Sequence, residues 1–177
     1  MNNTTSYFLR LPDGSLDGGG LPACDFQSMG KLRSGEITGI TSIDNSTTYH
    51  NWSVLTTTIE SIINTEIEGI NNKWIHYLDP DLAVNPGDHP DHGATGHAIQ
   101  GLLVLRNFHQ SIYMGYCMSS SKDHLPVSDM FWKAGMLAVY EKAVYDYCGY
   151  STLKENPDLY LRWCSCKPKF LTVFPAS

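Results

Sequence analysis

The middle of the chain alternates between helical and extended hydrophobic patterns, and this alternation limits the folds open to it. From Trp52 to about Ile67, apolar residues recur at helical spacing on one face, and Asn51 is placed to cap that helix. Residues 74–78 predict a strand. A helix is expected next from about Gly93 to Asn107, and a strand from Ser111 to Cys117. The apolar face of this helix is expected to consist of Ala94, Ala98, Leu102 and Leu105. Helices that alternate with strands favour an α/β fold, in which crossing helices join parallel strands.

The N-terminal part is expected to add short elements. The segment Ser6–Leu11 predicts a strand, which Pro12-Asp13-Gly14 closes with a turn. Gly18-Gly19-Gly20 lacks the flanking residues of a phosphate-binding loop, so a surface loop is expected there. A short helix is expected from Gln27 to Arg33, and Glu36 to Ile43 is expected to be irregular or a short strand.

The C-terminal part predicts a second long helix, from about Ser128 to Tyr147, with Ser128 as its cap and Gly149 at its end. Its buried side is expected to consist of Met130, Phe131, Ala134, Leu137, Ala138, Val144 and Tyr145. A terminal helix at Pro157–Arg162 and an extended tail at Phe170–Phe174 could follow. No repeat or linker divides the sequence, so residues 1–177 are expected to form a single domain.

Composition narrows the function classes. The 177 residues include 12 Lys+Arg and 18 Asp+Glu, a net charge of −6, which argues against nucleic-acid binding. An apolar share of 42% with 17% charged residues excludes a disordered chain. No apolar run approaches the roughly 18 residues of a membrane span. No signal peptide is visible after Met1, and both a cytoplasmic and a secreted location stay open. Cys164 and Cys166 are the only close pair among five cysteines, a weak zinc signal.

One loop concentrates ionisable groups. Asp88-His89-Pro90-Asp91-His92 follows a predicted strand, where α/β sheets place their chemistry, and it offers the imidazole and carboxylate groups that bind catalytic zinc. Pro90 could be the first residue of the next helix, so that His89 and His92, three residues apart, point the same way. His97 lies about 140° away on that helix. Spacing alone leaves two alternatives open, a metal or acid–base site and a solvated acidic loop.

The same loop, followed by Thr95-Gly96, resembles the second metal motif of the PIG-L/LmbE family of zinc-dependent de-N-acetylases, which act on N-acetylglucosamine-type groups. Further segments that resemble this family are Arg10–Gly14, the helix around Trp52, Asp79-Pro80-Asp81 before Asn85-Pro86-Gly87, and the helix from Phe131 to Tyr145. The resemblance covers nearly the whole chain. It implies a Rossmann-like, mostly parallel sheet with flanking helices.

The resemblance also implies a role for each residue of the loop. His92 would bind zinc, and His89 would assist acid catalysis or stabilise the oxyanion. Asp91 would take part in catalysis by orienting a histidine. Zinc would polarise the amide carbonyl and activate a water. The expected substrate contacts are Arg10, Asp13 and Asp88. For Arg10 and Asp13, a purely structural role at a strand end and turn is at least as good an explanation as substrate binding.

The sequence departs from the family in one respect. It lacks the first motif, His-Pro-Asp-Asp, which in the family supplies two zinc ligands and the general base. The chain therefore resembles the C-terminal two-thirds of such an enzyme without its first strand or strands. One zinc ligand is expected from this chain, and the others from a missing N-terminal segment or a partner chain, with a homo-oligomer as one arrangement. The alternative is a catalytically inactive carbohydrate-binding or structural remnant that pairs with a partner.

Overall fold

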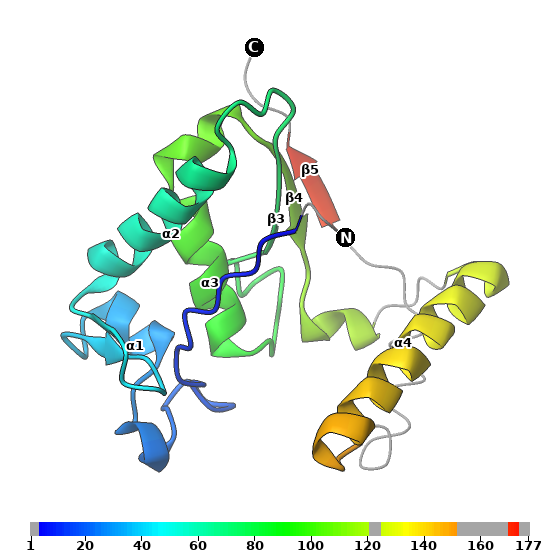
Figure 1. Ribbon diagram of the computed structural model, residues 1–177, viewed down its shortest axis with the longest axis horizontal. Coiled ribbons are helices and arrows are strands. Elements are labelled where there is room, and N and C mark those ends of the chain that lie inside the picture. The colour runs from blue at the N-terminus through cyan, green and yellow to red at the C-terminus, as the bar shows by residue number, and fades with distance from the viewer. Residues whose placement is uncertain (1–3, 121–124, 152–169, 174–177) are drawn as a thin grey trace. The chain divides into compact units, whose positions relative to one another are not determined.

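The chain forms two units in the computed structural model, which describes residues 4–120, 125–151 and 170–173 (Figure 1). The first unit comprises Met1–Gly115 and Phe170–Ser177, and the second comprises Tyr116–Lys169. The candidate residues of the sequence analysis all lie in the first unit. Its helices and strands are α1 (Met29–Ser34), β1 (Ile40–Thr41), β2 (Thr48–Tyr49), α2 (Trp52–Glu66), β3 (Trp74–Leu78), α3 (Pro90–Gln100), β4 (His109–Tyr113) and β5 (Phe170–Val173).

A three-stranded sheet in the order β3-β4-β5 carries the candidate site. β3 and β4 are parallel, with Trp74 opposite His109, and α3 connects them. β5 pairs with β4 in the antiparallel direction, with Phe170 opposite Tyr113. This strand–helix–strand unit confirms the α/β class and the strand at 74–78. The second strand begins two residues earlier than expected and ends at Tyr113, because its register follows β3.

Helix α2 confirms the strongest hydrophobic pattern of the sequence. Asn51 caps it, its Oδ1 accepting a hydrogen bond of 2.8 Å from the backbone N–H of Val54. Leu55 is fully buried, and Ile59, Ile62 and Ile63 are half-buried on the same face. The helix therefore presents its apolar stripe to the interior and its Ser and Thr residues to solvent.

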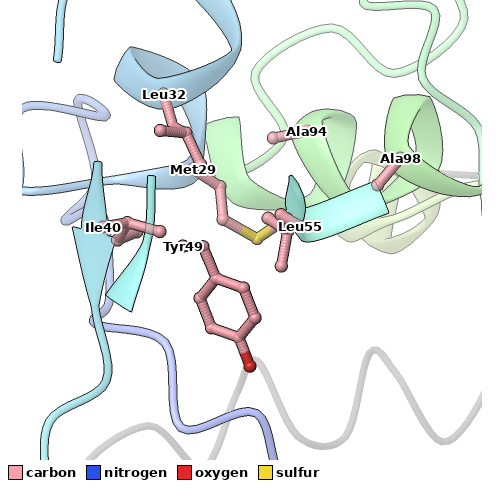
Figure 2. Close-up of a cluster of buried hydrophobic side chains, with 7 residues drawn as sticks. All are labelled: Met29, Leu32, Ile40, Tyr49, Leu55, Ala94 and Ala98. Carbon is pink, nitrogen blue, oxygen red and sulfur yellow. The ribbon is translucent and has the colours of Figure 1, made fainter. Parts of the chain in front are cut away.

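Two hydrophobic clusters meet at α2. Figure 2 shows the first, to which α1, both hairpin strands, α2 and α3 contribute. Its buried members are Met29, Leu32, Ile40, Tyr49, Leu55, Ala94 and Ala98. The second consists of Leu102, Leu105 and Phe108, and Ile59 packs against both clusters. The predicted inner face of the third helical segment is thus confirmed, although α3 ends at Gln100 and a 3₁₀ turn, Leu103–Asn107, completes it.

The predicted strand at Ser6–Leu11 is wrong. The hydroxyl of Tyr7 donates a hydrogen bond of 2.6 Å to Oε1 of Glu66, at the end of α2. Leu9 and Leu11 pack against the first cluster, so the segment packs along α2 and joins no ladder. Arg10 has a φ of 52°, a left-handed conformation that interrupts an extended strand. The apolar residues of this segment are thus used in the core and not in a sheet.

The glycine loop is closed by its own hydrogen bonds. The N–H of Gly20 donates to the carbonyl of Gly14, at 2.7 Å, and the hydroxyl of Ser28 donates to the carbonyl of Gly18, also at 2.7 Å. Ser28 is fully buried and also caps α1. The loop therefore fixes the turn after Pro12 relative to α1. The antiparallel pair β1–β2 accounts for the expected short strand near residue 40.

The second unit contains α4 (Val127–Cys148), which confirms the second long helix. Gly149 ends it in a left-handed conformation, as expected, but the cap at Ser128 is wrong because the N-cap position is Pro126. Of the expected buried side, Met130, Ala134, Leu137 and Val144 are half-buried, whereas Phe131, Ala138 and Tyr145 are exposed. The predicted helix at 157–162 lies outside the described residues. None of the helices in the described ranges is long and apolar enough to cross a membrane.

Candidate functional site

The loop after β3 is fixed to the end of β4 by a buried amide. Asn85 is 1% exposed. Its Nδ2 donates to the carbonyl of Asp79 at 2.9 Å, and its Oδ1 accepts from the N–H of Gly115 at 2.9 Å. The loop before α3 is thereby held across the carboxyl ends of the two parallel strands. This role could not be predicted from the sequence, because Asn85-Pro86-Gly87 by itself indicates only a turn.

Helix α3 begins on the candidate motif itself. His89 is the N-cap, and Pro90 is the first helical residue, as expected. Nδ1 of His89 accepts a hydrogen bond of 3.2 Å from the N–H of Asp91. A backbone N–H only donates, so Nδ1 must be unprotonated, and a neutral His89 carries its proton on Nε2. Among the described residues, this Nε2–H has no hydrogen-bond acceptor.

His92 is held in the opposite tautomer. Its Nδ1 lies 2.9 Å from Oδ1 of Asp88, whose side chain is only 2% exposed. An ionised carboxylate only accepts hydrogen bonds, so Nδ1 carries the proton, and a neutral His92 has its lone pair on Nε2. The ring centroids of His89 and His92 are 5.5 Å apart, which confirms that the two histidines share a face. The two neighbouring rings thus differ in which nitrogen carries the proton.

A second group of donor atoms surrounds His89. One atom each of Asp13, His89 and Asp91 lie within 4.8 Å of one another, an arrangement that could hold a metal ion. Nε2 of His89 is 3.7 Å from Oδ1 of Asp13, and Nδ1 is 3.9 Å from Oδ2 of Asp91. Oδ1 of Asp91 is buried and has no hydrogen-bond partner in the part of the chain that the structure describes. An unsatisfied buried carboxylate oxygen is costly, and a cation or a donated hydrogen bond would relieve it.

Gly14 explains how Asp13 reaches this group. Its N–H donates a hydrogen bond of 2.7 Å to Oδ2 of Asp91. A Cβ at position 14 would lie 2.6 Å from Oδ1 of Asp91, so only glycine fits against the carboxylate. The segment at residues 12–14, for which a strand end and turn were expected, therefore carries Asp13 to α3. Gly115 is similar, because its Cβ would overlap the carboxylate of Asp88.

The remaining predicted site residues lie elsewhere. Nη1 of Arg10 forms an ion pair of 2.6 Å with Oδ2 of Asp44. Hydrogen bonds from Ser46 and Ser42, and the Arg10 charge to a smaller extent, hold the pKa of Asp44 well below its usual range. Asp88, expected at the substrate, is buried against His92. The structure thus brings Asp13, Asp88, His89, Asp91 and His92 together and places Arg10 with Asp44.

No family model, no curated protein and no solved structure matches this chain. The assignment of function therefore depends on the residues of the site. The group of donor atoms that could hold a metal ion consists of one imidazole and two carboxylates, those of His89, Asp13 and Asp91. This donor set fits a divalent metal, but His92, the expected zinc ligand, is not a member of it among the described residues.

Proposed function

We propose that this chain contributes to the active site of a zinc-dependent de-N-acetylase of the PIG-L type, with a Rossmann-like domain. The reaction would remove the acetyl group from an N-acetylated amino sugar or glycoconjugate. The observation that carries the proposal is a pair of hydrogen bonds, from the N–H of Asp91 to Nδ1 of His89 and between Nδ1 of His92 and Oδ1 of Asp88, from which we infer opposite tautomers of the two rings. His92 presents a lone pair and His89 presents a proton donor, at ring centroids 5.5 Å apart. Amide hydrolysis at a metal needs both groups next to each other.

His92 is the residue that would hold zinc, through Nε2. The hydrogen bond from Nδ1 to Asp88 fixes the ring and makes it a better ligand, as carboxylate–histidine pairs do in metal sites. When bound, zinc supplies a Lewis acid for the amide carbonyl and lowers the pKa of a water. Asp88 is shielded from solvent, so its hydrogen bond to His92 is not weakened by competing water.

His89 would act as the proton donor. In the tautomer that the N–H of Asp91 imposes, Nε2–H is available for the oxyanion that develops on the carbonyl oxygen, or for the departing amine. Use of Nε2 as a metal ligand would instead require moving the proton to Nδ1 and breaking the bond to Asp91. The donor role therefore fits the observed hydrogen bonds better than a ligand role. Asp91 positions both the ring and the turn at Gly14.

The rest of the ligand set would come from a segment that carries the His-Pro-Asp-Asp motif. The order β3-β4-β5 leaves the outer edge of β3 without a neighbouring strand among the described residues. A strand added there in parallel would end at the same edge of the sheet as the loop before α3. The added residues would then face His92. This geometry supports a complementing N-terminal segment or partner chain.

Metal binding by the purified chain tests the first part of this proposal. Wild type, His92→Ala and the exposed control His50→Ala are each titrated with Co²⁺ and with Zn²⁺. The visible spectrum of Co²⁺ reports histidine coordination, and competition with a chromophoric chelator measures Zn²⁺ binding. Binding that the control retains and His92→Ala loses is the expected result. Equal binding by all three proteins would overturn the ligand role of His92.

Acetate release tests the second part. N-acetylglucosamine conjugates are incubated with zinc-loaded protein, with and without an added segment that carries His-Pro-Asp-Asp. Acetate release that depends on the added segment and on His92 supports the hydrolase. Zinc binding with no acetate release in either case would favour the non-catalytic carbohydrate-binding alternative.

A further inference from the structure

A cavity of about 250 Å³ lies in the first unit between α1, the loop after β3 and α3. Its walls are mainly apolar, with Pro80, Leu82 and Ala94 among them. Three ionisable side chains also line it, those of Arg33, Asp88 and His97. The volume is slightly below the roughly 300 Å³ at which pockets begin to hold drug-sized ligands, so it suits a smaller molecule.

Arg33, an exposed residue, supplies the positive charge of this cavity, and the acidic Asp88 also lines it. Within the described residues its guanidinium forms no ion pair, although the chain as a whole carries an excess of acidic groups. The basic residue nearest to it in sequence, Lys31, is paired with Glu36 and bonded to the carbonyl of Phe26. A guanidinium beside apolar walls offers a planar pair of N–H donors, which matches the two oxygens of a carboxylate.

His97 is the neutral polar group of the cavity. Burial, and to a lesser extent the charge of Arg33, lower the pKa of His97 below its ordinary value of 6.5. The imidazole is therefore uncharged at neutral pH, and it can form one more hydrogen bond without adding a second positive charge. Arg33 remains the one positively charged group that lines the cavity.

We propose that this cavity binds a small aliphatic carboxylate, with the carboxylate on Arg33 and the alkyl group against Pro80, Leu82 and Ala94. A monoanion fits better than a phosphate dianion, because Asp88 also lines the cavity and would repel the second negative charge of a dianion. The apolar walls favour a short alkyl chain over a polyol. The proposal is independent of the hydrolase assignment, since neither His89, Asp91 nor His92 lines this cavity.

The cavity nevertheless shares one residue with the candidate site. Asp88 is one of the residues that line the cavity, and its carboxyl group is hydrogen-bonded to His92. A ligand in the cavity would contact the residue that holds the ring of His92. Its occupancy should therefore be detectable at the ring of His92 as well as at His97.

Ligand titration followed by NMR of the histidine rings tests the proposal on the full chain. Acetate, butyrate, the neutral isostere butyramide and inorganic phosphate are the probes. Butyrate is expected to bind saturably with a Kd of about 1 mM, a reasonable affinity for six non-hydrogen atoms. It should shift the ring resonances of His97 and leave those of His50 unmoved. His50 lines a second cavity that Arg33 also borders, so a shift of His50 alone would place the ligand there and overturn the proposal.

Three variants complete the test. Arg33→Gln should weaken butyrate binding at least tenfold, whereas the exposed control Arg106→Gln should leave it unchanged. Gly93→Ala adds one methyl group to the cavity wall, where Cβ would meet Leu82 at an ordinary 3.6 Å, so it should weaken butyrate more than acetate. Binding of butyramide or phosphate as tight as that of butyrate, or binding that survives Arg33→Gln, would contradict the proposal.

Discussion

Asp88 and His92 lie one helical turn apart and are joined by a hydrogen bond of 2.9 Å between Oδ1 and Nδ1. The carboxyl group is almost completely buried, and the imidazole is about a quarter exposed, with a 27% exposed side chain. The bond therefore links a shielded acceptor to a ring that faces the site. Because this hydrogen bond uses Nδ1, Nε2 is the nitrogen through which His92 would bind a metal.

Asp88→Asn should reduce the zinc affinity of the protein about 10- to 100-fold, the usual effect of removing such a partner of a metal ligand. The amide is a weaker acceptor and can turn its NH₂ group toward Nδ1, which would favour the wrong tautomer of His92. Competition with a chelator measures the change. Asp25→Asn, at an exposed left-handed residue that asparagine tolerates, is the matched control. Unchanged affinity in Asp88→Asn would show that this hydrogen bond does not matter for the metal.

Gly14→Ala should destabilise the protein by about 1–3 kcal/mol, because the new Cβ would lie 2.6 Å from Oδ1 of Asp91 and force the two segments apart. Urea unfolding followed by tryptophan fluorescence measures the free energy of unfolding. In an Asp91→Ala background the same substitution should cost less, since the clashing carboxylate is gone. Strictly additive effects of the two substitutions would argue against this contact.

Two glycines of α3 form a matched pair. Gly96→Ala should be strongly destabilising, because its Cβ would overlap the carbonyl of Leu78 and lie 3.0 Å from the N of Pro80. Gly93→Ala meets only ordinary contacts and should stabilise the helix by up to about 1 kcal/mol through helix propensity. Thermal unfolding of both variants tests the difference. A similar Tm for the two would mean that α3 does not pack this closely on the end of β3.

The lowered pKa of Asp44 predicts that the free energy of unfolding depends on pH. Its pKa is lowered in the folded protein, so its contribution is present above the ordinary value of 3.8 and is lost as the pH falls further toward the folded pKa. Ser46→Ala should raise the pKa of Asp44 more than Arg10→Ala does, because the side-chain hydrogen bond that it removes has a larger effect than the Arg10 charge. Carboxyl ¹³C NMR titration measures both. The reverse order would show that the ion pair with Arg10 dominates.

Local patterns predicted the elements that depend on local contacts. The periodicity of α2, its cap at Asn51 and the inner face of Ala94 and Ala98 were all visible, because each depends on residues within one element. The predicted strand at Ser6–Leu11 was wrong, because an extended apolar segment can pair in a sheet or pack on a helix. The choice depends on Glu66 and on the first cluster, which are distant in sequence.

The candidate site was predicted in part. The spacing of His89 and His92 indicated a shared face, and the structure confirms it. The hydrogen-bond partners were not foreseen, since Asp88 was expected at the substrate. The contact of Gly14 with Asp91 could not be read from spacing either. It joins residues 77 positions apart, and only the tertiary structure brings them together.

That separation has a consequence for the order of folding. Both histidines and Asp88 belong to the segment from β3 to β4, whose strands pair with each other through a single connection. Asp13 arrives on a remote segment, and closing that longer loop has the larger entropic cost. We therefore expect the rings of His89 and His92 to reach their positions early in folding, and the segment at Gly14 to pack against α3 late. A substitution at Gly14 would then mainly speed unfolding, whereas one at Gly96 would mainly slow folding.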